Sequence, residues 1–195
     1  MEPLPLPALW RRADEPVAGH EIASRLLAGD RYARTRGVAQ QAARLARARK
    51  LERSDRRRLL AAAWLHDSGP AELGSHASLV IARRLRSAGS EELARIVAHC
   101  GGAPMAAALA EHPPVVREFP VPARGDSALL MLLDVAIITT RSDGAPGTPV
   151  DALRDRLQHV PAGDPGVRAL VALVARIGDD PDARELVEML GRRAG

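Results

Sequence analysis

The stretch RRRLLAAAWLHDSGP, residues 56–70, decides the fold class of this chain. Leucine, alanine and arginine dominate it, and all three favour helix. Ser54 can cap the start of that helix. The Ser-Gly-Pro sequence at the other end stops it, because proline disfavours helical backbone in the residue before it. The stretch therefore predicts a helix whose last turn carries His66 and Asp67, an imidazole next to a carboxylate.

The composition of the whole chain also favours helices. The hydrophobic set makes up 46% of the 195 residues, but the aromatic residues are only two Trp, one Tyr and one Phe. Leucine, alanine and valine must therefore fill the core, and such small filling suits closely spaced helices, whereas sheets are enriched in β-branched and aromatic residues. We expect an all-α protein, a bundle of about 8–10 helices in a single domain.

Capping residues, glycine and proline divide the chain into helical segments. Residues 1–17 are expected to form a flexible arm, and residues 18–195 to form the domain. Residues 112–125, which contain four prolines, are expected to cross the bundle as a loop, and residues 141–149 to form a second loop. The expected helices span residues 31–49, 56–67, 75–88, 90–100, 103–111, 127–140, 150–158, 165–177 and 181–192.

Cysteine content and hydropathy bear on the compartment. Cys100 is the single cysteine, which excludes an intramolecular disulfide. The first residues lack the pattern of a signal peptide, and no apolar run approaches the roughly 18 residues of a membrane span. We therefore expect a cytoplasmic protein that does not enter a membrane.

A basic stretch, Arg44–Arg58, contains eight basic residues and two acidic ones. Such a stretch can attract phosphate-rich partners. It contains no aromatic side chain on which a base could stack. A solvated surface between helices is the simpler interpretation, and nucleic acid is not the expected partner.

Three acidic or basic side chains are the first candidates for chemistry. His66 and Asp67 offer the nitrogen and oxygen donors that suit manganese, iron or zinc. A structural role is also open, in which the histidine complements the negative end of its helix and the aspartate begins a turn. Asp134 lies in the apolar run ALLMLLDVAII. A carboxylate there is costly unless it is paired, hydrogen-bonded or bound to metal, and an ion pair and a metal site are both open.

Two further histidines are expected at helix ends. His76 lies in a first turn, where the positive end of the helix dipole favours the neutral imidazole that binds metal or accepts a proton. His99 ends a helix, where an imidazole can simply complement the dipole. Cys100 follows it, either as a soft metal ligand or, more commonly in an alanine-rich helix, as a small core residue.

Five blocks in order resemble the motifs of HD-domain metal-dependent phosphohydrolases over about residues 30–160: RYARTRGVAQQA, LLAAAWLHDSGPAE, GSHASLVIARRLRS, ARIVAHCGGA and LLMLLDVAIITTRSDG. The resemblance implies the helical fold of that family. In the family, a histidine on the first motif helix, the His-Asp pair and a later aspartate hold a divalent metal that activates water for attack on a phosphate ester. By resemblance, His66 and Asp67 are that pair, and His76 and His99 contact phosphate or a second metal.

The chain departs from the family at three positions. Arg34 stands where the family has its first histidine ligand, and a guanidinium cannot bind a cation. Cys100 stands where the family has the second of two adjacent histidines. An alignment without gaps places the last aspartate of the family at Ile137, with Asp134 one helical turn earlier and on nearly the same face.

The first of two hypotheses is a non-catalytic protein of the HD-domain fold that binds a ligand or a partner. In it, Arg34 replaces the metal cation and pairs with Asp67 or Asp134. This hypothesis, which we favour, predicts no bound metal. It also predicts that an Arg34→Ala protein is less stable than its parent.

The second hypothesis is a metal-dependent phosphohydrolase with a reduced site. His66, Asp67 and Asp134 would hold manganese, iron or zinc, and His76 and His99 would assist hydrolysis of a phosphate ester or nucleotide. A small phosphorylated ligand is compatible with both hypotheses. The sequence carries no signature of an oligomeric state.

Overall fold

The computed structural model describes residues 4–70, 77–109, 114–159 and 163–191. The fold is all-α, as the sequence predicts; within these residues the only extended pairing is a β-bridge between Thr140 and Pro146. The elements are α1 (Leu6–Trp10), α2 (Pro16–Leu26), α3 (Gly29–Ala48), α4 (Arg53–Leu65), α5 (Ala77–Ser87), α6 (Glu91–His99), the 3-10 turn η2 (Cys100–Gly102), α7 (Ala103–Leu109), α8 (Val115–Glu118), α9 (Arg124–Ile138), α10 (Pro149–His159), α11 (Pro165–Asp179) and α12 (Pro181–Gly191).

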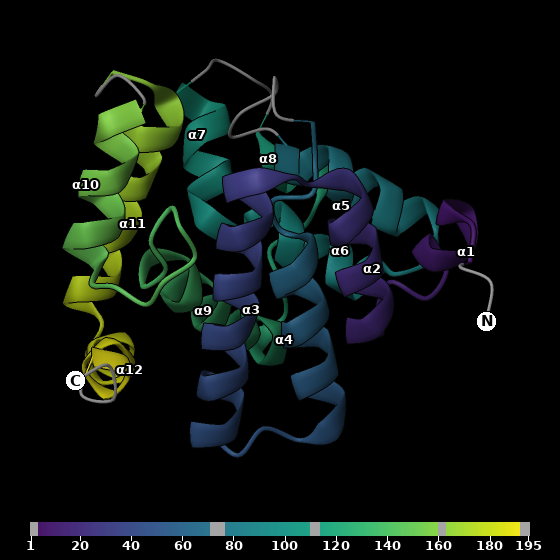
Figure 1. Ribbon diagram of the computed structural model, residues 1–195, viewed down its shortest axis with the longest axis horizontal. Coiled ribbons are helices and arrows are strands. Elements are labelled where there is room, and N and C mark those ends of the chain that lie inside the picture. Colours follow the sequence, from purple (N-terminus) through teal and green to yellow (C-terminus); the bar gives the residue numbers. More distant parts are fainter. Residues whose placement is uncertain (1–3, 71–76, 110–113, 160–162, 192–195) are drawn as a thin grey trace.

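Helices α4 and α9 form the centre of the bundle. Helix α4 packs against α2, α3, α6 and α9, and α9 also packs against α3, α6 and α11. Ala61, Ala62 and Ala63 of α4 are fully buried, and their small side chains let the neighbouring helices approach closely. In Figure 1, α3 and α4 run antiparallel beside each other, with α10, α11 and α12 on one side of them and α1 on the other.

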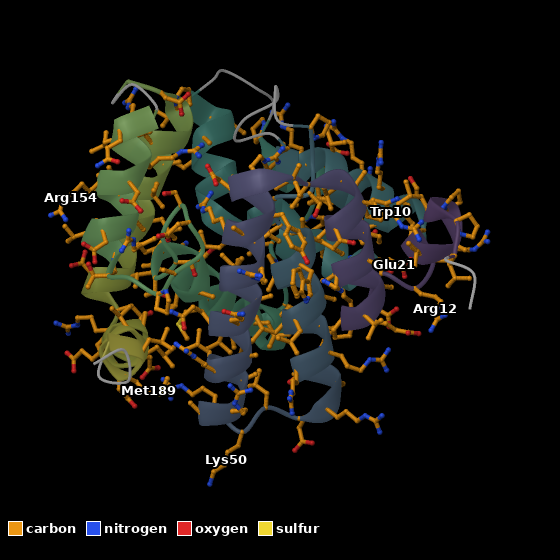
Figure 2. The ribbon with its side chains drawn as sticks, viewed as in Figure 1. Trp10, Arg12, Glu21, Lys50, Arg154 and Met189 are labelled. Atoms are coloured by element: carbon orange, nitrogen blue, oxygen red, sulfur yellow. The ribbon has the colours of Figure 1, made fainter. Side chains whose placement is uncertain are left out.

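The turn between α3 and α4 places the end of α4 beside the start of α3. Lys50 in this turn has a positive φ of 50°, a conformation that reverses the chain tightly. Its side chain extends away from the bundle (Figure 2). Because the two helices are antiparallel, the residues that follow α4 return to the first turns of α3, where Arg31 and Arg34 lie.

Two glycines fix α3 against the loop that follows α9. A Cβ atom at Gly37 would lie 2.2 Å from the carbonyl oxygen of Gly144, and Gly144 itself has a φ of +83°. Neither position tolerates a side chain without movement of the backbone. This close approach places the first half of α3 next to the end of α9.

The first residues pack more tightly than the sequence predicts. Among the described residues of the expected arm, 4–17, the segment Leu6–Trp10 is helical, and Leu9 and Trp10 are 1% and 9% exposed. The Arg84 guanidinium lies over the Trp10 ring at 5.8 Å. This part of the expected arm packs against the core, because burial of two large apolar side chains in one turn of helix is favourable. The flexibility of the arm stays a prediction.

Two local predictions also need correction. Helix α4 begins at Arg53 with Glu52 at its N-cap, and no side chain caps it, so Ser54 lies inside the first turn. The expected loop over residues 112–125 contains the short helix α8, in its described part. The other expected helices are confirmed within a few residues at their described ends. None of the described helices is both long and apolar enough to cross a membrane.

Candidate functional site

A pocket of about 110 Å³ lies at the end of α4. Helices α3, α5, α9, α10 and α11 and the turn η2 contribute to its wall. Ile137 of α9 and Leu170 of α11 supply apolar surface. The ionisable and hydroxyl side chains that line it are Arg34, His66, Asp67, Ser78, Cys100 and Arg156.

The pocket brings together four positions that form one site in the family that the sequence resembles. Arg34, His66, Asp67 and Ile137 all line it, although they come from three separate parts of the chain. These are the positions that correspond, by the resemblance described above, to the first histidine, the His-Asp pair and the last aspartate of the family. Two of the four therefore hold side chains that cannot bind a metal, a guanidinium and a hydrocarbon.

His66 is held in one orientation by its own helix. Its Nδ1 lies 2.9 Å from the Ala63 carbonyl oxygen, and a carbonyl can only accept, so Nδ1 donates. Burial lowers the pKa of His66, and the nearby Asp67 charge offsets this only in part. The imidazole is therefore neutral near pH 7, with a lone pair on Nε2. No group among the described residues lies within hydrogen-bonding distance of that atom.

Asp67 pairs with Arg31 rather than with Arg34. The Arg31 Nη2 atom lies 3.3 Å from Asp67 Oδ1, and it also donates to the carbonyl oxygens of Asp67 at 2.5 Å and Gly69 at 2.9 Å. Burial raises the pKa of Asp67, but the neighbouring imidazole and two guanidinium groups outweigh burial and leave this pKa below its ordinary value. Asp67 is thus ionised and already has a cationic partner.

Arg34 does not form the ion pair that the sequence predicts. Among the described residues no carboxylate lies at ion-pair distance from its guanidinium, so the predicted pairing with Asp67 or Asp134 is corrected. Arg31 lies one helical turn closer to the start of α3 than Arg34, and its side chain contacts the turn after α4. Burial lowers the pKa of Arg34, the Asp67 charge opposes this, and Arg156 lowers it further. Arg34 and Arg156 are thus two mutually repelling cations on one pocket.

Asp134 lies outside the pocket, although it is fully buried. Its Oδ1 accepts a hydrogen bond from the Gly101 backbone N–H at 2.8 Å, and its Oδ2 lies 2.8 Å from Arg176 Nη2. Burial raises the pKa of Asp134 to about 6, even though these two partners lower it. Of the two interpretations that the sequence left open, the structure shows an ion pair. Asp134 holds η2 and α11 against α9, whereas Ile137 faces the pocket.

The remaining candidates lie in three different environments. His99 Nε2 is 2.9 Å from the Phe119 carbonyl oxygen, so this histidine links α6 to the segment after α8 and does not line the pocket. Cys100 does line it, but burial raises the pKa of its thiol well above the ordinary value, and its Sγ lies 3.2 Å from the Val97 carbonyl. His76 lies outside the described residues.

Among the described residues no three His, Cys, Asp or Glu side chains come together as a group that could hold a metal ion. The donors present in the pocket are His66 Nε2 and the Asp67 carboxylate, with the Cys100 thiol beside them. Manganese and iron accept nitrogen and oxygen donors of this kind, and zinc also accepts sulfur.

The basic stretch Arg44–Arg58 is partly neutralised by acidic neighbours. Arg58 lies 2.7 Å from carboxylate oxygens of Asp55, Glu92 and Asp126. Arg57 lies 2.9 Å from Asp14. These ion pairs support the interpretation of the stretch as a structural surface between helices.

Sequence reasoning missed three residues of this region. Arg31 follows Asp30 in the first turn of α3, Ser78 is the second residue of α5, and Arg156 lies in the second half of α10. Arg156 had no detectable signal, because it is about 90 residues from His66 in sequence and only the packing of α10 brings it to the pocket. Comparisons with models of protein families, with curated proteins and with solved structures find no match.

Proposed function

We propose that this protein is a non-catalytic module, related to the HD-domain proteins that its sequence resembles, and that its pocket at the end of α4 binds a small anion such as a phosphoryl group. The observation that carries the proposal is the pair Arg34 and Arg156. Both guanidinium groups line the pocket, and neither has a carboxylate at ion-pair distance among the described residues.

The charge balance of the pocket favours an anion. The one carboxylate among the described residues that line it, Asp67, is already paired with Arg31, which leaves Arg34 and Arg156 without an ion-pair partner of their own in this part of the structure. Their repulsion costs free energy that an anion placed between them would recover. Guanidinium groups also present fixed pairs of N–H donors that match the oxygens of a phosphoryl or carboxylate group.

The size of the pocket limits how much of a ligand it encloses. Pockets that bury drug-sized ligands typically measure about 300–1,000 Å³, whereas this one measures about 110 Å³. A phosphoryl group fits such a space, and a nucleotide does not. A larger phosphorylated compound would place only its phosphoryl end between the two arginines.

The absence of catalysis is supported by the side chains at two positions. Arg34 and Ile137 stand where the resemblance places metal ligands, and both face the pocket. A fixed guanidinium there supplies the positive charge that a metal would otherwise supply to a phosphate. It cannot lower the pKa of a water molecule as a bound metal does.

The test is calorimetric titration of the full chain with orthophosphate and with a small phosphate monoester. Arg156→Ala and Arg34→Ala should each weaken binding by about 10–100-fold, the usual range for one lost hydrogen bond to a charged group. Arg154→Ala is the control for α10, because Arg154 points away from the bundle (Figure 2) and pairs with Asp151 at 3.2 Å. Arg36→Ala, at an exposed position of α3, is the control for Arg34.

Absence of phosphate binding by the parent protein would overturn the proposal. So would equal losses in the pocket variants and in their controls, because a general loss of positive charge would then explain the effect.

One observation favours the alternative of a metal-dependent phosphohydrolase with a reduced site. The Nε2 lone pair of His66 has no partner among the described residues, and Asp67 lies next to it. Elemental analysis after incubation with manganese, iron or zinc, for the parent and for Arg34→His, decides between the two. We expect an empty parent and a metal-binding variant, whereas stoichiometric metal in the parent would favour the hydrolase.

A further inference from the structure

Two buried polar atoms of the pocket have no partner among the described residues, His66 Nε2 and Ser78 Oγ. Both residues line the pocket and are only 7% exposed. A buried polar atom without a hydrogen bond costs free energy, and native proteins rarely leave one without a reason. A bound ligand that pairs with both atoms would remove this cost.

The two atoms differ in what they can offer a ligand. Nδ1 of His66 donates to the Ala63 carbonyl, so one ring proton is on Nδ1, and in the neutral imidazole Nε2 is then an acceptor only. Since Nδ1 is turned back toward its own helix, the Nε2 edge is the one left for the pocket. The Ser78 hydroxyl can donate or accept. The Asp67 carboxylate beside them accepts only.

An oxyanion without a proton cannot satisfy this arrangement while the imidazole is neutral. Its oxygens accept hydrogen bonds from Arg34, Arg156 and Ser78, but it has no hydrogen to offer His66 Nε2. It would instead bring oxygen lone pairs toward the imidazole lone pair and the Asp67 charge. An oxyanion that keeps one P–OH group donates that hydrogen to the acceptor side of the pocket and keeps its charged oxygens on the arginine side.

We infer that the pocket selects oxyanions that carry a proton, such as hydrogen phosphate or a singly protonated phosphate monoester, over fully ionised ones such as sulfate. His66 is the residue that distinguishes the two, because its Nε2 atom requires a donor. This inference rests on the proposed function, since it specifies the chemistry of the anion that Arg34 and Arg156 hold.

The test compares orthophosphate with sulfate, two anions of similar size and shape, by calorimetric titration at pH 7.5. The full chain is first treated with a chelator and then freed of it, so that no metal contributes. Orthophosphate keeps at least one proton at this pH, and sulfate keeps none. We expect orthophosphate to bind at least about tenfold more tightly, because sulfate leaves a buried acceptor without a partner.

Two variants assign the selectivity to a residue. His66→Gln supplies an amide that can donate or accept, so the ratio of the two affinities should fall toward one, mainly through weaker binding of phosphate. Ser78→Ala removes a hydroxyl that donates to either anion, so both affinities should fall while the ratio stays. Circular dichroism and the melting temperature confirm that each variant is folded, and Ser78→Ala supplies the comparison if His66→Gln is not.

Each outcome separates the inference from the proposed function. Equal affinities for the two anions would leave an anion site in place and overturn the selection by protonation. If the ratio of the phosphate affinity to the sulfate affinity changes by the same amount in Ser78→Ala and in folded His66→Gln, that outcome would overturn the assignment of the selectivity to His66. Binding of neither anion would overturn the proposed function, and this inference with it.

Discussion

Asp67 and Asp134 are carboxylates of the same bundle, the first partly exposed and the second fully buried, and their surroundings differ. Asp67 lies among Arg31, Arg34 and His66, which leave its pKa below the ordinary value, and one of the nearby cations has no ion-pair partner among the described residues. Asp134 has one cation and one backbone N–H, and burial raises its pKa to about 6. The region of Asp67 therefore contains an unpaired positive charge that a ligand could bind, whereas the one cation beside Asp134 is already paired with it.

This difference separates the pocket that we propose as a binding site from a structural link. Both carboxylate oxygens of Asp134 have a partner, and the ion pair joins α9 to α11. In the pocket that Asp67 lines, the guanidinium groups of Arg34 and Arg156 have no ion-pair partner among the described residues. His66 Nε2 and the Ser78 hydroxyl have no hydrogen-bond partner there. A buried charge alone does not indicate function, because an internal partner can satisfy it; unpaired polar groups that share one pocket do.

The largest expected effect comes from Asp134→Asn. The native pKa of Asp134, about 6, lies above its unfolded value of about 4. Between these two pH values the native state therefore keeps a proton that the unfolded state has lost. Its contribution to stability therefore falls as the pH rises from about 4 to about 6, by about 3 kcal/mol. Asparagine keeps the Gly101 hydrogen bond without the charge, and the variant should lack this fall.

Urea denaturation of parent and variant between pH 4 and pH 7.5 measures this effect. Asp179→Asn, at an exposed position near the end of α11, is the control and should follow the parent. Identical pH profiles for Asp134→Asn and the parent would show that burial of this carboxylate carries no titration cost.

The next effect compares two arginines one turn apart on α3. Arg31→Ala removes hydrogen bonds to Asp67 and Gly69 and should lower the free energy of unfolding by about 2 kcal/mol. Arg34→Ala removes no ion pair and relieves the repulsion from Arg156, so its effect should stay within about 1 kcal/mol. Urea denaturation at pH 7.5 tests both. A larger loss for Arg34→Ala than for Arg31→Ala would restore the pairing that the sequence predicted.

The smallest effect is that of Asp67→Asn. Because the native pKa of Asp67 lies below its unfolded value, its charge stabilises the native state above pH about 4, and this contribution is lost as the pH falls through the native pKa. The variant should therefore be less stable than the parent at pH 7.5, by about 1 kcal/mol or less because the pair with Arg31 is partly exposed. The two proteins should converge at low pH, and a difference that persists there would contradict the charge-based explanation.

The helical segments could be predicted from the sequence because their signals are local. Alanine-rich and leucine-rich runs favour helix, and glycine and proline end it. The exceptions were α1, α2 and α8, and of these α1 and α8 are too short for periodicity to identify. Tertiary burial of Leu9 and Trp10 stabilises the first of them.

The candidate site was predicted only in part. His66 and Asp67 were identified from their position in the last turn of an alanine-rich helix, and Arg34 from the order of the motif blocks. All three line one pocket. Asp134 was assigned to the site and lies outside the pocket, which Ile137 lines instead. His99 was assigned to the site and is instead bound to the Phe119 carbonyl, because the sequence cannot indicate which backbone group lies opposite a helix end.

The sequence by itself determined the helical class of this protein and the imidazole and carboxylate at the end of α4, since both depend on neighbours along the chain. Only the tertiary structure decided how the charges pair: Arg31 with Asp67, Arg176 with Asp134, and Arg34 and Arg156 left together on the pocket. The physical reason is that ion pairing depends on distances of a few ångströms between helices. Those distances are set by packing, at alanines of α4 and at Gly37 and Gly144, and not by any local pattern of residues.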